Sequence, residues 1–155
     1  IGKVGEIFSM RGISESIKTQ SDAHGMEELI KLVKRNYGDI VFVTLVDFDT
    51  KYGHRNDTYG FAKALMEFDE ALSVLLDELD VHDLLIITAD HGNDPTTPST
   101  DHSREYVPLL VYSKANEHGK CLGVRKTFAD VAATIADVFS LNKPSVGESF
   151  LEHIV

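Results

Sequence analysis

The fold is decided by residues 86–94, IITADHGND, where an apolar segment ends directly in an acid, an imidazole and a glycine. The whole apolar segment, DLLIITA at 83–89, is rich in branched side chains and predicts a buried strand. Gly92 permits a sharp turn after that strand, so Asp90 and His91 can lie together at the edge of a sheet. The stretch therefore predicts a rigid support for two metal-binding side chains.

The same succession of strand and acid occurs upstream. Residues 39–46, DIVFVTLV, predict a strand covered on both faces, and Asp47-Phe48-Asp49 follows it directly. The other predicted elements are a candidate short strand at 1–8, helices at about 26–37, 59–79 and 127–139, and a strand at 107–112. Because helices alternate with apolar strands, the predicted fold class is α/β, with a mainly parallel sheet flanked by helices.

Composition narrows the classes of partner. The chain has 155 residues, of which 43% are hydrophobic and 26% charged, as is typical of a globular protein. A formal net charge of −10 argues against nucleic acid and against anionic membranes as partners. No apolar run approaches the ~18 residues of a membrane span, and no signal-peptide pattern opens the chain. The lone Cys121 rules out an intrachain disulfide and fits the reducing cytoplasm, where we expect the protein.

Three polar groups are candidate metal ligands. Asp49 and His54 lie five residues apart, Asp90 and His91 are adjacent, and His102 follows eleven residues after His91. Carboxylates mixed with imidazoles suit Mn²⁺, Zn²⁺ or Fe, whereas an all-oxygen set favours Mg²⁺ or Ca²⁺. Each group alone also fits an ordinary turn, and Asp90 can serve one ion or bridge two. Together they predict a two-metal site for phosphoryl transfer at the carboxyl ends of the strands.

Three segments resemble the signature segments of the phosphopentomutase family. They are VDFDTKYGHR at 46–55, TADHGNDP at 88–95 and TDHSREYVP at 100–108. The resemblance covers essentially the whole chain and is closer than any to the wider alkaline phosphatase superfamily. It implies an alkaline-phosphatase-like core, of which this chain is a part, and a site that holds two Mn²⁺ ions.

The resemblance also implies site residues and a reaction. The implied ligands fall into one set for each ion, namely Asp49, His54 and His102, then Asp90 and His91. The family's five-residue spacing between acid and imidazole favours Asp49 over Asp47. The implied reaction interconverts ribose 1-phosphate and ribose 5-phosphate, or their 2-deoxy counterparts, through a phosphothreonine and a bisphosphorylated sugar. The sugar phosphate is thus the implied substrate.

The chain departs from the family in one respect. A complete member has an N-terminal segment with a further ligand Asp and the nucleophilic Thr, and a separate cap domain. None of these is recognisable here, and the chain begins Ile1-Gly2-Lys3 without Met, which suggests a processed product or a fragment. Residues 1–155 are therefore expected to be the C-terminal part of the metal-binding core domain. We expect this part to contain no catalytic residue and to be inactive alone.

Two alternatives stay open. The chain can belong to another two-metal phosphomutase or phosphatase of the superfamily, such as a cofactor-independent phosphoglycerate mutase. It can also be a non-catalytic metal-binding or interaction module. Lys51 and Arg55 beside the first ligand pair are either phosphate-binding or paired with nearby acids.

Overall fold

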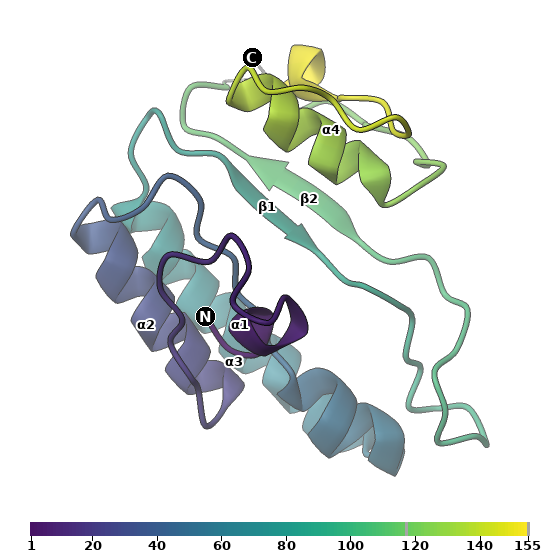
Figure 1. Ribbon diagram of the computed structural model, residues 1–155. Helices are drawn as coiled ribbons and strands as arrows, with labels where there is room; N and C mark the ends of the chain where they lie inside the picture. The colour runs from purple at the N-terminus through teal and green to yellow at the C-terminus, as the bar shows by residue number, and fades with distance from the viewer. Residues whose placement is uncertain (117, 155) are drawn as a thin grey trace. The chain divides into compact units, whose positions relative to one another are not determined.

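The computed structural model describes residues 1–116 and 118–154. The elements in chain order are α1 (Val4–Ile7), α2 (Asp22–Lys34), η1 (Phe48–Tyr52), η2 (Gly53–Arg55), α3 (Thr58–Glu78), β1 (Leu85–Thr88), β2 (Leu109–Tyr112), α4 (Ala129–Val138) and η3 (Leu151–His153) (Figure 1). The chain divides into two compact units. The first comprises Ile1–Leu79 with His91–Tyr106, and the second comprises Asp80–Asp90 with Val107–Val155.

Two amphipathic helices, α2 and α3, form the body of the first unit and lie side by side (Figure 1). Both begin at a side-chain cap, since Ser21 Oγ accepts from the backbone N–H of His24 at 3.2 Å and Asp57 Oδ1 accepts from that of Gly60 at 2.8 Å. Their buried apolar residues are Met26, Ala64 and Leu75. The two predicted helices are therefore confirmed, with α2 starting a turn earlier than the apolar spacing indicates.

The predicted strand at 39–46 does not form. Its segment instead meets the first residues of the chain. The N-terminal amino group of Ile1 donates to Phe42 O at 2.7 Å, and the backbone N–H of Thr44 donates to Ile1 O at 3.2 Å. This pair of bonds has the pattern of a single rung of a parallel ladder. The next N–H, of Lys3, donates to the Thr44 hydroxyl at 2.8 Å rather than to a carbonyl, so the ladder stops there. Phe42 is 57% exposed, which contradicts the predicted cover on both faces.

The N-terminal residues also differ from expectation. The candidate short strand at 1–8 is instead the single helical turn α1. Its apolar residues do not alternate strictly, and Val4 is buried while Ile7 is 66% exposed. A loose alternation of this kind over so few residues does not distinguish a strand from a helical turn.

The strands of the second unit pair antiparallel, with Leu85 opposite Tyr112 and Thr88 opposite Leu109. The prediction of a mainly parallel sheet is therefore wrong for this pair, while the positions of both strands are confirmed. The physical reason lies in the connection, since a parallel return needs a crossover, which is usually a helix. Residues 89–108, all of them described, contain no helix.

Helix α4 (Ala129–Val138) buries a mixed face of two alanines and two polar residues. Its buried residues are Asp130, Ala133, Thr134 and Ala136. Thr134 Oγ1 donates to Asp130 O at 2.8 Å and accepts from the backbone N–H of Phe150 at 3.0 Å, which fixes the fully buried Phe150 on the helix. Phe128 and Val138, which the apolar spacing of residues 127–139 would place in the core, are 59% and 41% exposed.

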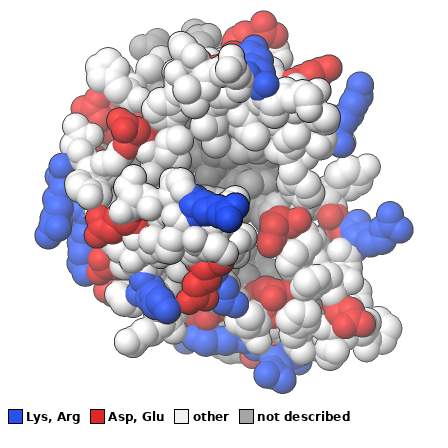
Figure 2. Space-filling view, in the orientation of Figure 1, with Lys and Arg blue, Asp and Glu red and all other residues white. Residues whose placement is uncertain are grey.

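Charged side chains of both signs are interspersed on the face shown in Figure 2. Within the described ranges, none of the helices combines the length and apolarity that a membrane crossing requires.

Candidate metal centre

Two short irregular helices carry the first pair of predicted ligands. Asp49 lies in the π-helix η1 and His54 in the 3₁₀-helix η2, in a segment predicted as a plain loop. Phe48 anchors η1 on α3, where its ring lies 5.4 Å from the ring of Phe61 and 6.5 Å from that of Phe68. These edge-to-face contacts hold the backbone immediately before Asp49. Single π turns of this kind are frequent at functional sites.

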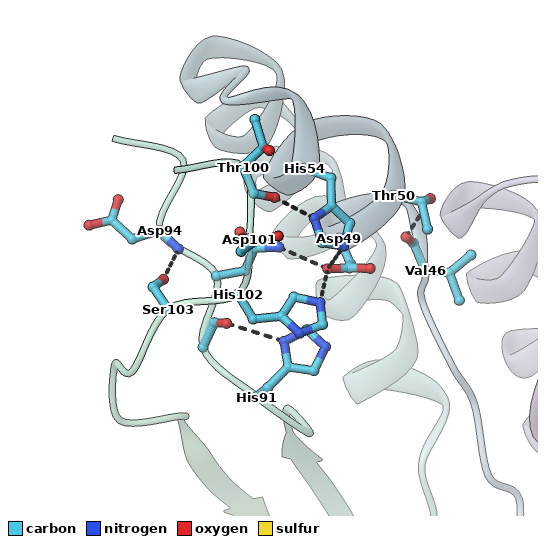
Figure 3. Close-up of polar contacts among 12 residues, drawn as sticks. Val46, Asp49, Thr50, His54, His91, Asp94, Thr100, Asp101, His102 and Ser103 are labelled. Carbon is cyan, nitrogen blue, oxygen red and sulfur yellow. Dashed lines mark hydrogen bonds and ion pairs between the residues drawn. The ribbon is translucent and has the colours of Figure 1, made fainter. Parts of the chain in front are cut away.

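Three predicted ligands come together in the first unit. Asp49 Oδ1 lies 3.4 Å from His54 Nε2 and 3.2 Å from His102 Nε2. Among residues 1–116 and 118–154, these three form the one group whose donor atoms all lie within 4.8 Å of one another and could hold an ion. Figure 3 shows the three side chains pointing toward one another. One carboxylate and two imidazoles fit a divalent transition metal, and side chains 30–47% exposed leave an ion access to them.

The backbone carbonyl of Thr100 fixes the orientation of one imidazole. His54 Nδ1 lies 2.5 Å from Thr100 O (Figure 3). A neutral imidazole next to a carbonyl donates through Nδ1–H, which leaves the lone pair of Nε2 directed at the cluster. The side chain of His54 is thus held in the tautomer that can bind a metal.

The loop after β1 turns back on itself at Gly92. The N–H of Ser103 donates to Gly92 O at 3.2 Å, in an isolated antiparallel bridge. A Cβ at position 92 would lie 2.8 Å from both Ser103 O and the backbone nitrogen of Glu105, so only glycine fits here. The bridge brings His102 against His91. The two imidazole rings stack, with their centroids 3.7 Å apart.

The second predicted pair has a different position. His91 stacks on His102, and its Nδ1 lies 3.2 Å from Gly92 O, but it is outside the group of three donors. Asp90 is exposed and is the last residue of its segment in the second unit. The structure therefore assembles Asp49, His54 and His102, and the second set of ligands stays a prediction.

Asp47, the alternative acid, has a structural role. It is buried and accepts from the backbone N–H of Asp22 at 3.1 Å and from Lys51 Nζ at 2.8 Å. Its own N–H donates to Asp22 Oδ1 at 3.0 Å, so the two acids clamp the start of α2 to the start of η1. The hydrogen bond with Asp47 raises the pKa of Lys51, and burial raises the pKa of Asp22. Lys51 thus pairs with an acid, which favours the structural role over phosphate binding.

Two groups at the site went unrecognised in the sequence. Asn93 Nδ2 donates to Asp49 Oδ1 at 2.8 Å, and the carbonyl of Thr100 contacts His54. Any residue carries a backbone carbonyl, so nothing in the sequence marks Thr100. Asn93 follows Gly92 directly in the segment after β1, and this position was the one feature of the sequence that could have pointed to a role at the site.

Comparison with known proteins identifies relatives along the whole chain. The family described as the Metalloenzyme superfamily matches residues 3–143. A phosphopentomutase of Caldanaerobacter subterraneus subsp. tengcongensis is 52% identical over 154 residues, which are 99% of this chain and 39% of the relative. A phosphopentomutase of Lachnoclostridium phytofermentans is 50% identical over 152 residues, which are 98% of this chain and 39% of the relative. The chain thus spans about two fifths of the length of these curated relatives.

Proposed function

The chain belongs to the metalloenzyme superfamily, and we propose that it is the C-terminal part of the metal-binding core domain of a phosphopentomutase. Identities of 52% and 50% over nearly the whole chain support this proposal. The observation that carries it is the convergence of Asp49, His54 and His102 on one point. Because the chain spans 39% of each relative, the mutase activity is proposed for a protein of the relatives' full length. For the chain itself we propose binding of a divalent metal.

The proposed centre holds two Mn²⁺ ions. Asp49, His54 and His102 bind the first, and Asp90 and His91 contribute to the second. Mn²⁺ accepts mixed carboxylate and imidazole ligands, whereas Mg²⁺ prefers oxygen alone. Bound ions of this kind supply charge stabilisation at the transferring phosphoryl group and activate its nucleophile. Asp49 supplies the negative charge that attracts the cation, while the bond at Thr100 holds the lone pair of His54 toward it.

The proposed reaction is an isomerisation of pentose phosphates. Ribose 1-phosphate, or its 2-deoxy counterpart, is converted to the 5-phosphate through a bisphosphorylated sugar. The phosphothreonine of that reaction is proposed to lie in a segment outside these 155 residues, as are the cap domain and the strands that complete a mainly parallel sheet. The single parallel rung between Ile1 and the segment at 42–44 supports such a sheet. We place the enzyme in the cytoplasm, in nucleoside catabolism.

The matching family is a superfamily, which makes another enzyme with the same metal centre the next candidate after a phosphopentomutase. The superfamily is wider than a single activity, so another two-metal phosphomutase or a phosphatase with the same centre is the second candidate. A non-catalytic metal-binding module is the third. Assays of the full-length protein with ribose 1-phosphate, 3-phosphoglycerate and a generic phosphate monoester separate the three, since we expect turnover of the pentose phosphate alone.

Calorimetric titration of the chain with Mn²⁺ tests the metal centre directly. We expect binding by the unchanged chain and loss of that binding in the double variant His54→Ala, His102→Ala, because two of the three ligands are then absent. An unchanged affinity in this variant refutes the ligand assignment. The isolated chain should not convert ribose 1-phosphate, and clear turnover would contradict the proposal that the nucleophile lies elsewhere.

A further inference from the structure

The side chain of Asn93 ends on the oxygen around which the metal cluster is arranged. Its Nδ2 donates to Asp49 Oδ1 at 2.8 Å. The same oxygen lies 3.4 Å from His54 Nε2 and 3.2 Å from His102 Nε2. Asn93 therefore contacts the carboxylate at the point where an ion would bind, rather than at the far oxygen.

An amide donor suits this position better than a charged one. A carboxylate oxygen has two lone pairs, so it can accept one hydrogen bond and still bind a cation. The neutral amide adds no positive charge that would repel the ion. The contrast is Asp47, whose Oδ2 accepts from the ammonium of Lys51 at 2.8 Å and whose charge is thereby balanced within the chain. Asn93 orients Asp49 and leaves its charge available.

The segment that carries the ligands has room for this amide only because residue 53 is glycine. A Cβ at Gly53 would overlap Asn93 Nδ2, and would lie 2.5 Å from its Cγ and 2.8 Å from its Oδ1. The backbone at Gly53 has φ −59° and ψ −61°, which every residue adopts. Glycine is therefore needed at position 53 for its lack of a side chain and not for its backbone conformation.

A plain role in anchoring the loop is the competing explanation. The same loop is tied to the ligand segment by Asn56 Nδ2, which donates to Thr97 O at 3.0 Å, and by Thr58 Oγ1, which donates to Pro95 O at 3.3 Å. Both of these bonds end on backbone carbonyls. Asn56 is therefore a matched control, an asparagine that anchors the loop without a hydrogen bond to Asp49.

We propose that Asn93 is a positioning residue for the metal ligand Asp49, and that Gly53 serves to admit it. The proposal rests on the metal centre proposed above and adds to it an asparagine that orients a ligand and a glycine that leaves room for that asparagine. Hydrogen bonds to ligating carboxylates hold the ligand in the geometry that the ion needs, and their loss typically lowers metal affinity ~10–100-fold.

The test is Mn²⁺ affinity of the chain, measured by calorimetry on four variants whose folding is checked by circular dichroism. We expect Asn93→Ala to weaken binding about 10–100-fold, and Gly53→Ala to weaken it comparably because the new Cβ displaces the amide. The double variant Gly53→Ala, Asn93→Ala should bind no more weakly than Asn93→Ala alone, since the group that clashes is already gone. The control Asn56→Gly suits the φ of +51° at that position and should change affinity less than about 3-fold.

Four results overturn the proposal. If Asn93→Ala binds Mn²⁺ as tightly as the unchanged chain, Asn93 does not position Asp49. The metal centre itself would still be supported by loss of binding in the His54→Ala, His102→Ala variant. An equal loss in Asn56→Gly means that loop anchoring alone explains the effect. If the losses of Mn²⁺ affinity in Gly53→Ala and Asn93→Ala add up in the double variant, Gly53 does not act by admitting the amide of Asn93. Absence of Mn²⁺ binding by the unchanged chain overturns the metal centre and this inference together.

Discussion

Asp49 in the first unit and Asp130 in the second are both held by several partners, yet the kinds of partner differ. The side chain of Asp130 is 5% exposed and lies 2.7 Å from Arg125 Nε. That of Asp49 is 30% exposed and faces two imidazoles and the amide of Asn93. The charge of Asp130 is balanced by a permanent cation of the chain. Imidazoles and an amide leave the charge of Asp49 available to a cation from solution.

The network around Asp130 closes the C-terminal segment on α4. The backbone N–H of Glu148 donates to Asp130 Oδ1 at 2.9 Å, and Arg125 Nη2 donates to Glu148 O at 2.9 Å. The Arg125 guanidinium also lies 5.7 Å from the centre of the Phe150 ring. Burial opposes ionisation of Asp130, but the bonds from Glu148 N–H and from Arg125 outweigh it and lower its pKa. This carboxylate stabilises the fold, whereas Asp49 is arranged to bind.

The largest effect is expected from Asp130→Ala, which should lower the stability of the chain. The change leaves Arg125 and the N–H of Glu148 without their acceptor, and breaking a buried pair of this kind costs about 3 kcal/mol. Chemical denaturation measures this loss. The control is Asp137→Ala, which removes the half-exposed pair with Lys143 and should cost below about 1 kcal/mol. Equal losses in both variants would contradict the distinction between the two carboxylates.

The converse substitution, Asp49→Ala, should leave stability nearly unchanged and remove metal binding. We expect Mn²⁺ affinity to fall at least about 100-fold, which corresponds to about 2.7 kcal/mol, while the metal-free free energy of unfolding changes by less than about 1 kcal/mol. Calorimetry and denaturation on the same sample give both numbers. A loss of stability as large as that of Asp130→Ala would show that Asp49 is structural.

Acid should remove the contribution of Asp130. Since its pKa in the folded state lies below the ordinary value of 3.8, its stabilising effect is fully present above that value and is lost as the pH falls through the folded pKa. The stability difference between the unchanged chain and Asp130→Ala should therefore be constant at neutral pH and shrink below about pH 4. Denaturation at a series of pH values tests this, and a difference that grows toward acid would contradict it.

The smallest effect is expected at the cap of α3. Asp57→Ala removes the acceptor of the Gly60 N–H, which should cost about 1 kcal/mol of stability. Because the side chain of Asp57 makes no hydrogen bond or ion pair with Asp49, His54 or His102, Mn²⁺ affinity should stay within about 3-fold. An affinity loss near that of Asn93→Ala would mean that the start of α3 also positions the ligands.

Local pattern was sufficient for the elements whose stability is local. Apolar periodicity located α2, α3 and α4, and the apolar runs located β1 and β2. The segment 39–46 has an equally strong strand pattern, but a strand needs a partner, and pairing depends on residues far along the chain. The direction of strand pairing likewise depends on the connection between the strands. Because the described residues 89–108 contain no crossover helix, β1 and β2 pair antiparallel.

The candidate site divides in the same way. Residue types and spacing predicted that three polar groups meet, and the family resemblance implied the set Asp49, His54 and His102, which the structure brings together. The contribution of Asn93 depends on the path of a loop across Gly53, which no spacing rule describes. The pairing of Lys51 with Asp47 required knowledge of which acid is buried.

The π-helix η1 has a consequence for how this segment can vary in length. A π turn holds one residue more than an α turn, and each residue of a helix turns the chain by about 100°. Deleting one residue within Phe48–Tyr52 would let the turn relax to α-helical geometry and swing His54 away from Asp49. Substitutions on the outer face of η1 can be tolerated, but insertions and deletions there cannot. Among homologues that bind metal here, the interval from acid to imidazole should therefore be invariant even where the residues between them differ.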